Sequence, residues 1–66
     1  MKVEVGEFFA LDYPTLEGGF TAEVDDLAAF LEELRGEYAF VSEPYMMGGV
    51  PCVKAYENLE SGAGGE

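Results

Sequence analysis

The sequence predicts an α+β domain in which a single helix packs on a small, mainly antiparallel sheet. One observation is the stretch 22–35, whose apolar residues recur every three or four positions, as on one face of a helix. Strand-like runs flank this stretch on both sides, and the pair Gly48–Gly49 is typical of a hairpin turn. A chain of 66 residues has room for one domain at most. We therefore expect one domain over residues 1–60 and a flexible, Gly-rich tail over residues 61–66.

The first strand is expected at the N-terminus, where Lys2–Val5 alternates polar and apolar residues. A second run, Phe8–Tyr13, is rich in aromatic residues. Gly6–Glu7 between them is either a two-residue hairpin turn or a bulge in one longer strand. The element order is accordingly strand-strand-helix-strand-strand or strand-helix-strand-strand. Residues 15–19 are expected to form a loop, because they follow a proline and include two glycines.

The helix is predicted over residues 22–35, with Thr21 as its N-cap residue and Gly36 as its stop signal. Phe30 is expected at the margin of the apolar face. The core-facing residues are Val24, Leu27, Ala28, Leu31 and Leu34. The residues on the opposite face are Asp25, Asp26, Ala29, Glu32 and Glu33.

The segment after the helix predicts a hairpin. A strand is expected over residues 37–42, a two-residue turn at Gly48–Gly49, and a returning strand over residues 50–56. The pairs expected to face each other are Glu43 with Lys54 and Val41 with Tyr56.

The charge balance is strongly acidic. Fourteen acidic residues against three basic ones, with no histidine, give a formal net charge of -11. Such a chain is repelled by nucleic acid and by anionic membranes, so we expect neither as a direct partner. Because 48% of the residues are hydrophobic, the chain should fold rather than form a disordered acidic tail. Uncompensated repulsion destabilises a compact state, so we interpret the charge as selected for something outside folding.

The residue types exclude several kinds of chemistry. With no histidine and one cysteine, Cys52, the chain cannot assemble a Cys/His zinc site, a four-Cys cluster or a histidine-based triad. We expect no cofactor, no metal site and no catalytic activity. Cys52 is expected to be a buried small hydrophobe in a reducing cytoplasm. No apolar run has the length of a signal peptide core or a membrane span, so we expect neither secretion by that route nor membrane insertion.

The acidic helix face is either an ordinary solvated exterior or the result of selection on charge, for which there are two hypotheses. One is a halophilic cytoplasm, where molar salt shortens the screening length to about 3 Å. The other is a cationic protein partner, in which rows of carboxylates occupy a groove that otherwise holds DNA phosphates. The expected partner-binding row on and just beyond the helix is Asp25, Asp26, Glu32, Glu33 and Glu37. A second expected row along the N-terminal strands is Glu4, Glu7, Asp12 and Glu17.

In size and charge the whole chain resembles the small phage-encoded DNA-mimic inhibitors, among them the anti-CRISPR proteins. The resemblance rests on no sequence motif and transfers no individual residue. It implies a non-catalytic inhibitor in the cytoplasm of a host bacterial cell. Its partner would be a basic DNA-binding complex, a CRISPR effector such as Cascade or a Cas nuclease, whose target DNA binding it would block.

The C-terminal segment supports an alternative. Ala63–Gly65 at the end of a small strand and helix chain resembles the ubiquitin-like sulfur carriers and protein modifiers, whose terminal Gly-Gly is adenylated and then thiocarboxylated or conjugated. Glu66 follows the pair, so a free Gly65 carboxylate requires the removal of Glu66. A plain flexible tail is the other interpretation of the same residues.

A second contact is expected at Tyr45–Met47, next to the predicted turn. Met and Tyr are enriched at interface cores, so this apolar tip is a candidate partner contact or homodimer seam. The alternative is that these residues complete a thin core.

Overall fold

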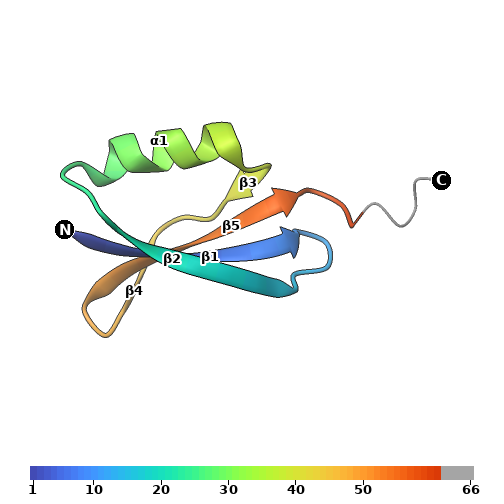
Figure 1. Cartoon of the computed structure of the whole chain (residues 1–66), viewed down its shortest axis with the longest axis horizontal. Helices are drawn as coiled ribbons and strands as arrows, with labels where there is room; N and C mark the ends of the chain where they lie inside the picture. The colour runs from blue at the N-terminus through green and yellow to red at the C-terminus, as the bar shows by residue number, and fades with distance from the viewer. Residues whose placement is uncertain (62–66) are drawn as a thin grey trace.

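The computed structural model describes residues 1–61, in which one helix packs on a five-stranded sheet (Figure 1). The elements in chain order are β1 (Lys2–Ala10), β2 (Leu16–Glu23), α1 (Leu27–Glu37), β3 (Phe40–Val41), β4 (Tyr45–Met47) and β5 (Val50–Asn58). The predicted α+β class is confirmed. The predicted tail, apart from Ser61, lies outside the described residues.

The sheet is mixed, with the strand order β2-β1-β5-β3, and β4 also pairs with β5. Three strand pairs are antiparallel, whereas β1 and β5 run parallel in the centre, with Val5 beside Val53. The sequence did not predict this parallel pair, which joins the two ends of the chain. Parallel neighbours need a crossover connection, and here the crossover contains α1.

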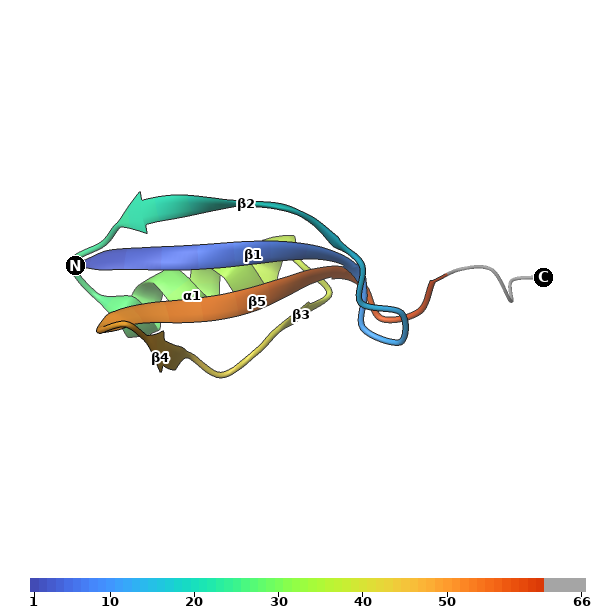
Figure 2. The ribbon, with the colours of Figure 1, turned by 90° about the horizontal axis from the view of Figure 1, so that it is seen from below.

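The core lies between α1 and one face of the sheet. Val3 and Val53 are fully buried there, and Leu31 and Leu34 reach them from the helix. Successive residues of a strand point to opposite faces of the sheet. The strand residues that alternate with these core residues therefore point to the face away from the helix. No element of residues 1–61 covers that other face (Figure 2), which we call the open face.

The N-terminal half differs most from prediction. Gly6–Glu7 is not a turn, because β1 runs through it, and the register shift after Glu7 agrees with the alternative of a bulge in one longer strand. The run predicted to reach Tyr13 ends at Ala10. The predicted loop over residues 15–19 is wrong, since β2 begins at Leu16 and pairs with β1 along its length.

The helix begins later than predicted. Thr21 is not an N-cap residue, because it lies in β2 opposite Glu4. Asp26 caps the helix instead, with its Oδ1 accepting hydrogen bonds from the backbone N–H groups of Ala28 (3.0 Å) and Ala29 (3.3 Å). The helix also continues through Gly36 and ends at Glu37 rather than at residue 35.

The predicted turn at Gly48–Gly49 is confirmed, and both glycines have positive φ angles, of 60° and 83°. Such angles suit a two-residue hairpin and strain any residue with a Cβ. The pairing predicted between the strand before β4 and β5 is wrong by one residue, because Val41 of β3 faces Ala55 rather than Tyr56. Lys54 does not pair with Glu43, because its backbone N–H donates to Ser42 Oγ at 2.9 Å.

Candidate functional site

The outer side of α1 carries exposed carboxylates. Glu32 and Glu33 are exposed there, and Glu37 is exposed at the last helical residue. Asp25 is exposed just before the helix. Arg35 donates to Glu32 Oε2 at 3.0 Å and neutralises part of this row. The row therefore presents excess negative charge to solvent.

Asp26 belongs to the same predicted row but has a structural task. Its carboxylate is the N-cap of α1, and it accepts two backbone hydrogen bonds. A negative charge at this end also interacts favourably with the helix dipole. Asp26 therefore stabilises the helix that displays the other acids, and it is a poor choice for testing partner contacts.

The acids predicted along the N-terminal strands do not form one row. Glu4 lies between buried Val3 and Val5 in β1 and therefore points to the open face. Glu7, two residues after Val5, points to the side of the sheet that α1 covers, which we call the helix side. Asp12 lies in the connection between β1 and β2, and Glu17 lies on β2 at the register shift. The structure thus distributes these four residues over different surfaces.

Glu7 makes a contact that the sequence did not reveal. The hydroxyl of Tyr38, the C-cap residue of α1, donates a hydrogen bond to Glu7 Oε2. This bond, burial and the negative charges of Glu7, Glu37 and Glu57 raise the pKa of Tyr38 to about 12. Both partners are partly buried, so this contact joins the end of the helix to the central strand.

Glu57 and Glu17 form a second acidic contact. The negative charge of Glu17 is the main cause that raises the pKa of the Glu57 carboxyl, followed by desolvation, a hydrogen bond with Glu17 and the charge of Glu7. Nothing in the sequence around Glu57 indicates this contact. Glu57 meets Glu7 and Glu17 because β5 lies next to β1, and no local pattern predicts that pairing.

The open face differs in charge from the rest of the protein. Lys54, for example, alternates with Val53 and Ala55 of the core and so points to this face. Strand alternation and cross-strand pairing place four charged side chains on it, two of each sign: Lys2, Lys54, Glu4 and Glu23. Their charges cancel, so the whole formal charge of -11 belongs to α1, the loops, the other strand positions and the chain ends.

Cys52 is buried, as predicted, with 5% of its surface exposed, and its thiol lies 3.4 Å from the backbone oxygen of Val50. Within residues 1–61, no three acidic or cysteine side chains are grouped so that they could hold a metal ion. The same residues contain no helix with the length and apolarity needed to cross a bilayer.

The fold and its surfaces define a small α+β domain with an acidic helix side and a neutral open face. Comparison with protein-family models, with curated proteins and with solved structures finds no match to this chain.

Proposed function

We propose that this protein is a non-catalytic DNA mimic of the anti-CRISPR type, which occupies a cationic DNA-binding groove in a bacterial defence complex and blocks target DNA binding. The observation that carries the proposal is the segregation of charge. Most of the acids lie on the side of the sheet that α1 covers and around the rim, where Arg35 is the one basic side chain, whereas the open face carries two charges of each sign. Solubility alone favours mixed signs across a surface, and folding stability does not favour such an excess.

The spacing of the helix acids supports mimicry of one DNA strand. Over α1, Leu27–Glu37, the chain advances about 16 Å along the helix axis, at about 1.5 Å per residue, and Asp25 and Asp26 lie just before its first turn. One strand of DNA presents about five phosphates over that length, at about 3.4 Å each. Residues 25–37 hold five carboxylates and one guanidinium. The number of carboxylates on and beside the helix therefore matches the number of phosphates on one strand. The pairing of Arg35 with Glu32 and the role of Asp26 as N-cap lower the negative charge that is free to meet a partner.

Binding of this kind has two expected properties. Arg–carboxylate pairs across the interface would orient the inhibitor, because the guanidinium fork matches a carboxylate in two-point geometry. The summed negative field would accelerate encounter with a cationic groove, and this acceleration falls as salt increases. The association rate should therefore fall more steeply with ionic strength than the dissociation rate rises.

Competition tests the proposal. A CRISPR effector such as Cascade or a Cas nuclease is incubated with the protein and then with labelled target duplex, and the fraction of bound DNA is measured. We expect saturable, stoichiometric loss of DNA binding. If an effector still binds its target DNA in the presence of excess protein, the mimic mechanism is excluded for that effector.

The position of the last strand favours a second candidate, a ubiquitin-like sulfur carrier or modifier. β5 is nine residues long, lies in the centre of the sheet and runs parallel to β1. A sheet with its first and last strands paired in parallel beneath one helix is the arrangement expected of a ubiquitin-like fold. In the sequence, Gly64 and Gly65 follow a few residues after Asn58, the last residue of this central strand.

One deletion separates the two candidates. Loss of residues 62–66 should leave DNA competition unchanged if the helix side is the site. If the chain is a carrier, the same deletion abolishes its function, and mass spectrometry of the intact protein shows thiocarboxylate or isopeptide products at Gly65 after loss of Glu66.

A further inference from the structure

The open face carries a hollow of about 430 Å³ between β2 and β4. Gly6 and Gly19 are cross-strand partners, so neither strand places a side chain at this point. Cys52 lines the hollow and is almost completely buried, and Leu16 and Tyr45 also line it. The hollow is therefore mainly apolar, and Glu4 is its one charged lining residue.

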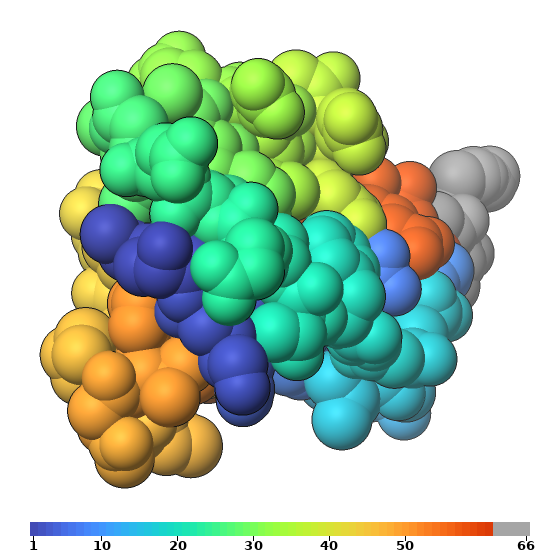
Figure 3. Space-filling model, turned by 60° about the vertical axis from the view of Figure 1, so that its left-hand side comes forward, coloured from blue at the N-terminus to red at the C-terminus, as the bar shows by residue number. Residues whose placement is uncertain are grey.

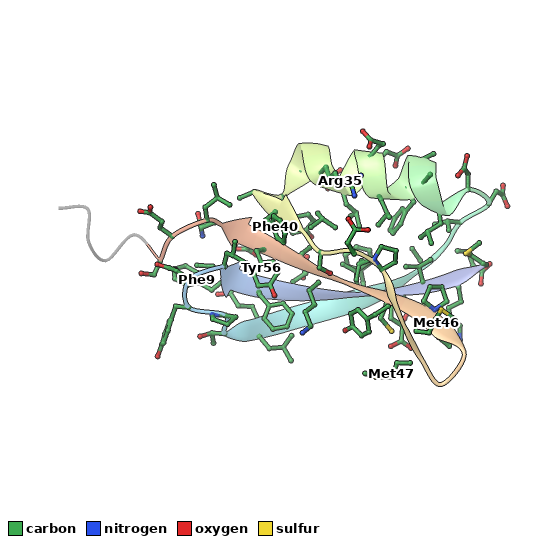
Figure 4. All side chains as sticks on the ribbon, turned by 180° about the vertical axis from the view of Figure 1, so that it is seen from behind. Phe9, Arg35, Phe40, Met46, Met47 and Tyr56 are labelled. Atoms are coloured by element: carbon green, nitrogen blue, oxygen red, sulfur yellow. The ribbon has the colours of Figure 1, made fainter. Side chains whose placement is uncertain are left out.

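A knob stands beside the hollow. The β4–β5 hairpin projects from the body of the protein next to the first strand (Figure 3). Met47 points from this hairpin to the side away from the helix, where it borders the hollow, whereas its neighbour Met46 points to the other side (Figure 4). Met46 and Met47 are 66% and 63% exposed. Flexible thioether side chains of this kind fill irregular apolar cavities well. Knob and hollow are thus neighbours on one surface.

Aromatic rings extend the apolar surface along the sheet. Phe8 stacks on Tyr56 with 5.1 Å between ring centroids, and Phe40 meets the same ring at 5.9 Å. Phe40 nevertheless remains 43% exposed. Lys54 Nζ lies 5.7 Å from the centroid of the Tyr45 ring, so its charge is placed over an aromatic face. Exposed apolar side chains gathered on one face and bordered by charged residues mark an interaction site.

We infer that the open face is the interface between two copies of this chain, in which the hairpin tip of each copy, with Met47, occupies the glycine hollow of the other. A two-fold interface uses the same patch on both subunits, so each patch must contain both the projection and its receptor. The hairpin tip and the hollow meet this requirement. The inference does not depend on the proposed function.

Charge favours a second copy as the occupant. Two proteins that each carry -11 repel each other, but the open face is neutral and offers both signs for pairing across the axis. Packed sheets lie about 10 Å apart. The two helices, each on the far side of its sheet, would then be on the order of 30 Å apart, about three screening lengths at 0.1 M salt. A cationic partner, by contrast, would be drawn to the helix side.

The dimensions of the face are also sufficient. Four strands at about 4.8 Å spacing and strands of up to nine residues at about 3.3 Å each give a surface of roughly 20 by 30 Å before side-chain relief. Stable interfaces bury roughly 800 Å² per partner. Side-chain relief adds accessible area to this flat area of roughly 600 Å², so a face-to-face dimer would use the whole open face, with the projecting hairpin included.

Sedimentation equilibrium of the full chain tests the inference. At concentrations on the order of 100 μM we expect the wild type to have twice its monomer mass of 7.1 kDa. Met47→Glu, and separately Leu16→Glu on the other side of the hollow, should raise the dissociation constant at least tenfold. Leu59→Glu is the matched control: it adds the same charge at an apolar residue that is 55% exposed and lies beyond β5. It should leave the dimer intact.

Far-UV circular dichroism and urea unfolding of each variant show whether it is folded, and the exposure of all three sites predicts that it is. A monomeric wild type overturns the inference and leaves the open face to a partner of other sequence. So does a dimer that survives both hollow variants, or one that Leu59→Glu disrupts equally.

Discussion

The contact between Tyr38 and Glu7 should contribute measurably to stability. Tyr38→Phe keeps the ring and removes the hydroxyl that donates to the Glu7 carboxylate. Hydrogen bonds to charged groups contribute roughly 1.5–3 kcal/mol. Because both residues are only partly buried and water competes for them, we expect a loss of about 1 kcal/mol. For a domain of this size, about 1 kcal/mol lowers the melting temperature by about 4–8 °C.

A double-mutant cycle measures this contact. Glu7→Gln alone also relieves repulsion from neighbouring carboxylates, so the informative quantity is the coupling between Glu7→Gln and Tyr38→Phe, obtained from urea unfolding at pH 7. Tyr13→Phe, at an exposed tyrosine in the β1–β2 connection, is the control and should change stability little. A coupling within about 0.3 kcal/mol of zero would refute the reasoning.

The pH dependence gives an independent check of the same bond. The pKa of Tyr38 is raised from 10.0 to about 12 in the folded protein. The folded state therefore holds this proton more tightly than the unfolded state, and the stability that results is fully present below pH 10. It should be lost as the pH rises through 12. The difference between wild type and Tyr38→Phe should shrink over that interval.

Three further predictions concern the cap, the acidic contact and the sheet. Asp26→Ala should lower the free energy of unfolding by about 1 kcal/mol through loss of the N-cap, whereas Asp25→Ala should change it by less than about 0.5 kcal/mol; urea unfolding distinguishes them. Glu57→Gln should raise the melting temperature at pH 7, because the raised pKa of Glu57 means that its ionised form is disfavoured in the folded state. The gain should vanish well below pH 4, where the carboxyl is protonated in both states. Gly19→Ala should cost more than about 1 kcal/mol, because its Cβ would lie 2.6 Å from a carbonyl oxygen of β1. Gly18→Ala, whose Cβ would meet only a side-chain oxygen at 3.6 Å, should cost less than about 0.5 kcal/mol. Equal effects at the two glycines would contradict the register of β2.

Local signals predicted some elements correctly. Leu31 and Leu34 repeat at helical spacing, and they are the buried residues of α1. Gly48–Gly49 predicted its turn because positive φ angles favour glycine. The apolar neighbours of Cys52 predicted its burial. In each case the signal that permits the prediction lies within a few residues in the sequence, although the burial itself comes from contacts with distant strands.

β2 could not be predicted in this way. It is an edge strand whose side chains are nearly all exposed, so it shows no alternation of apolar and polar residues. Its two glycines resemble a loop, and only pairing with β1 orders it. The same pairing explains the helix start. Thr21 and Asp26 are both good N-cap residues, but Thr21 belongs to β2, where it pairs with Glu4 of β1.

The candidate site was predictable in part. The outward position of Glu32 and Glu33 follows from helical periodicity and is confirmed by their exposure. The separation of Glu4 from Glu7 was available from strand periodicity, since residues three apart point to opposite faces. The contact between Glu57 and Glu17 was not, because it requires the parallel pairing of strands from the two ends of the chain.

The most direct test of the central claim compares two variants of equal charge in the DNA competition assay. The first neutralises the helix side with Asp25→Asn, Glu32→Gln, Glu33→Gln and Glu37→Gln, and it retains Asp26 as the cap. The second neutralises four acids elsewhere with Glu4→Gln, Glu23→Gln, Glu43→Gln and Glu60→Gln. Each removes four negative charges and changes the formal net charge from -11 to -7.

If the helix side replaces DNA in a cationic groove, the first variant should inhibit at least tenfold more weakly than wild type, and the second should inhibit within about threefold of it. Equal inhibition by the two variants would contradict the account, because it would mean that total charge, and not its placement on α1, determines binding.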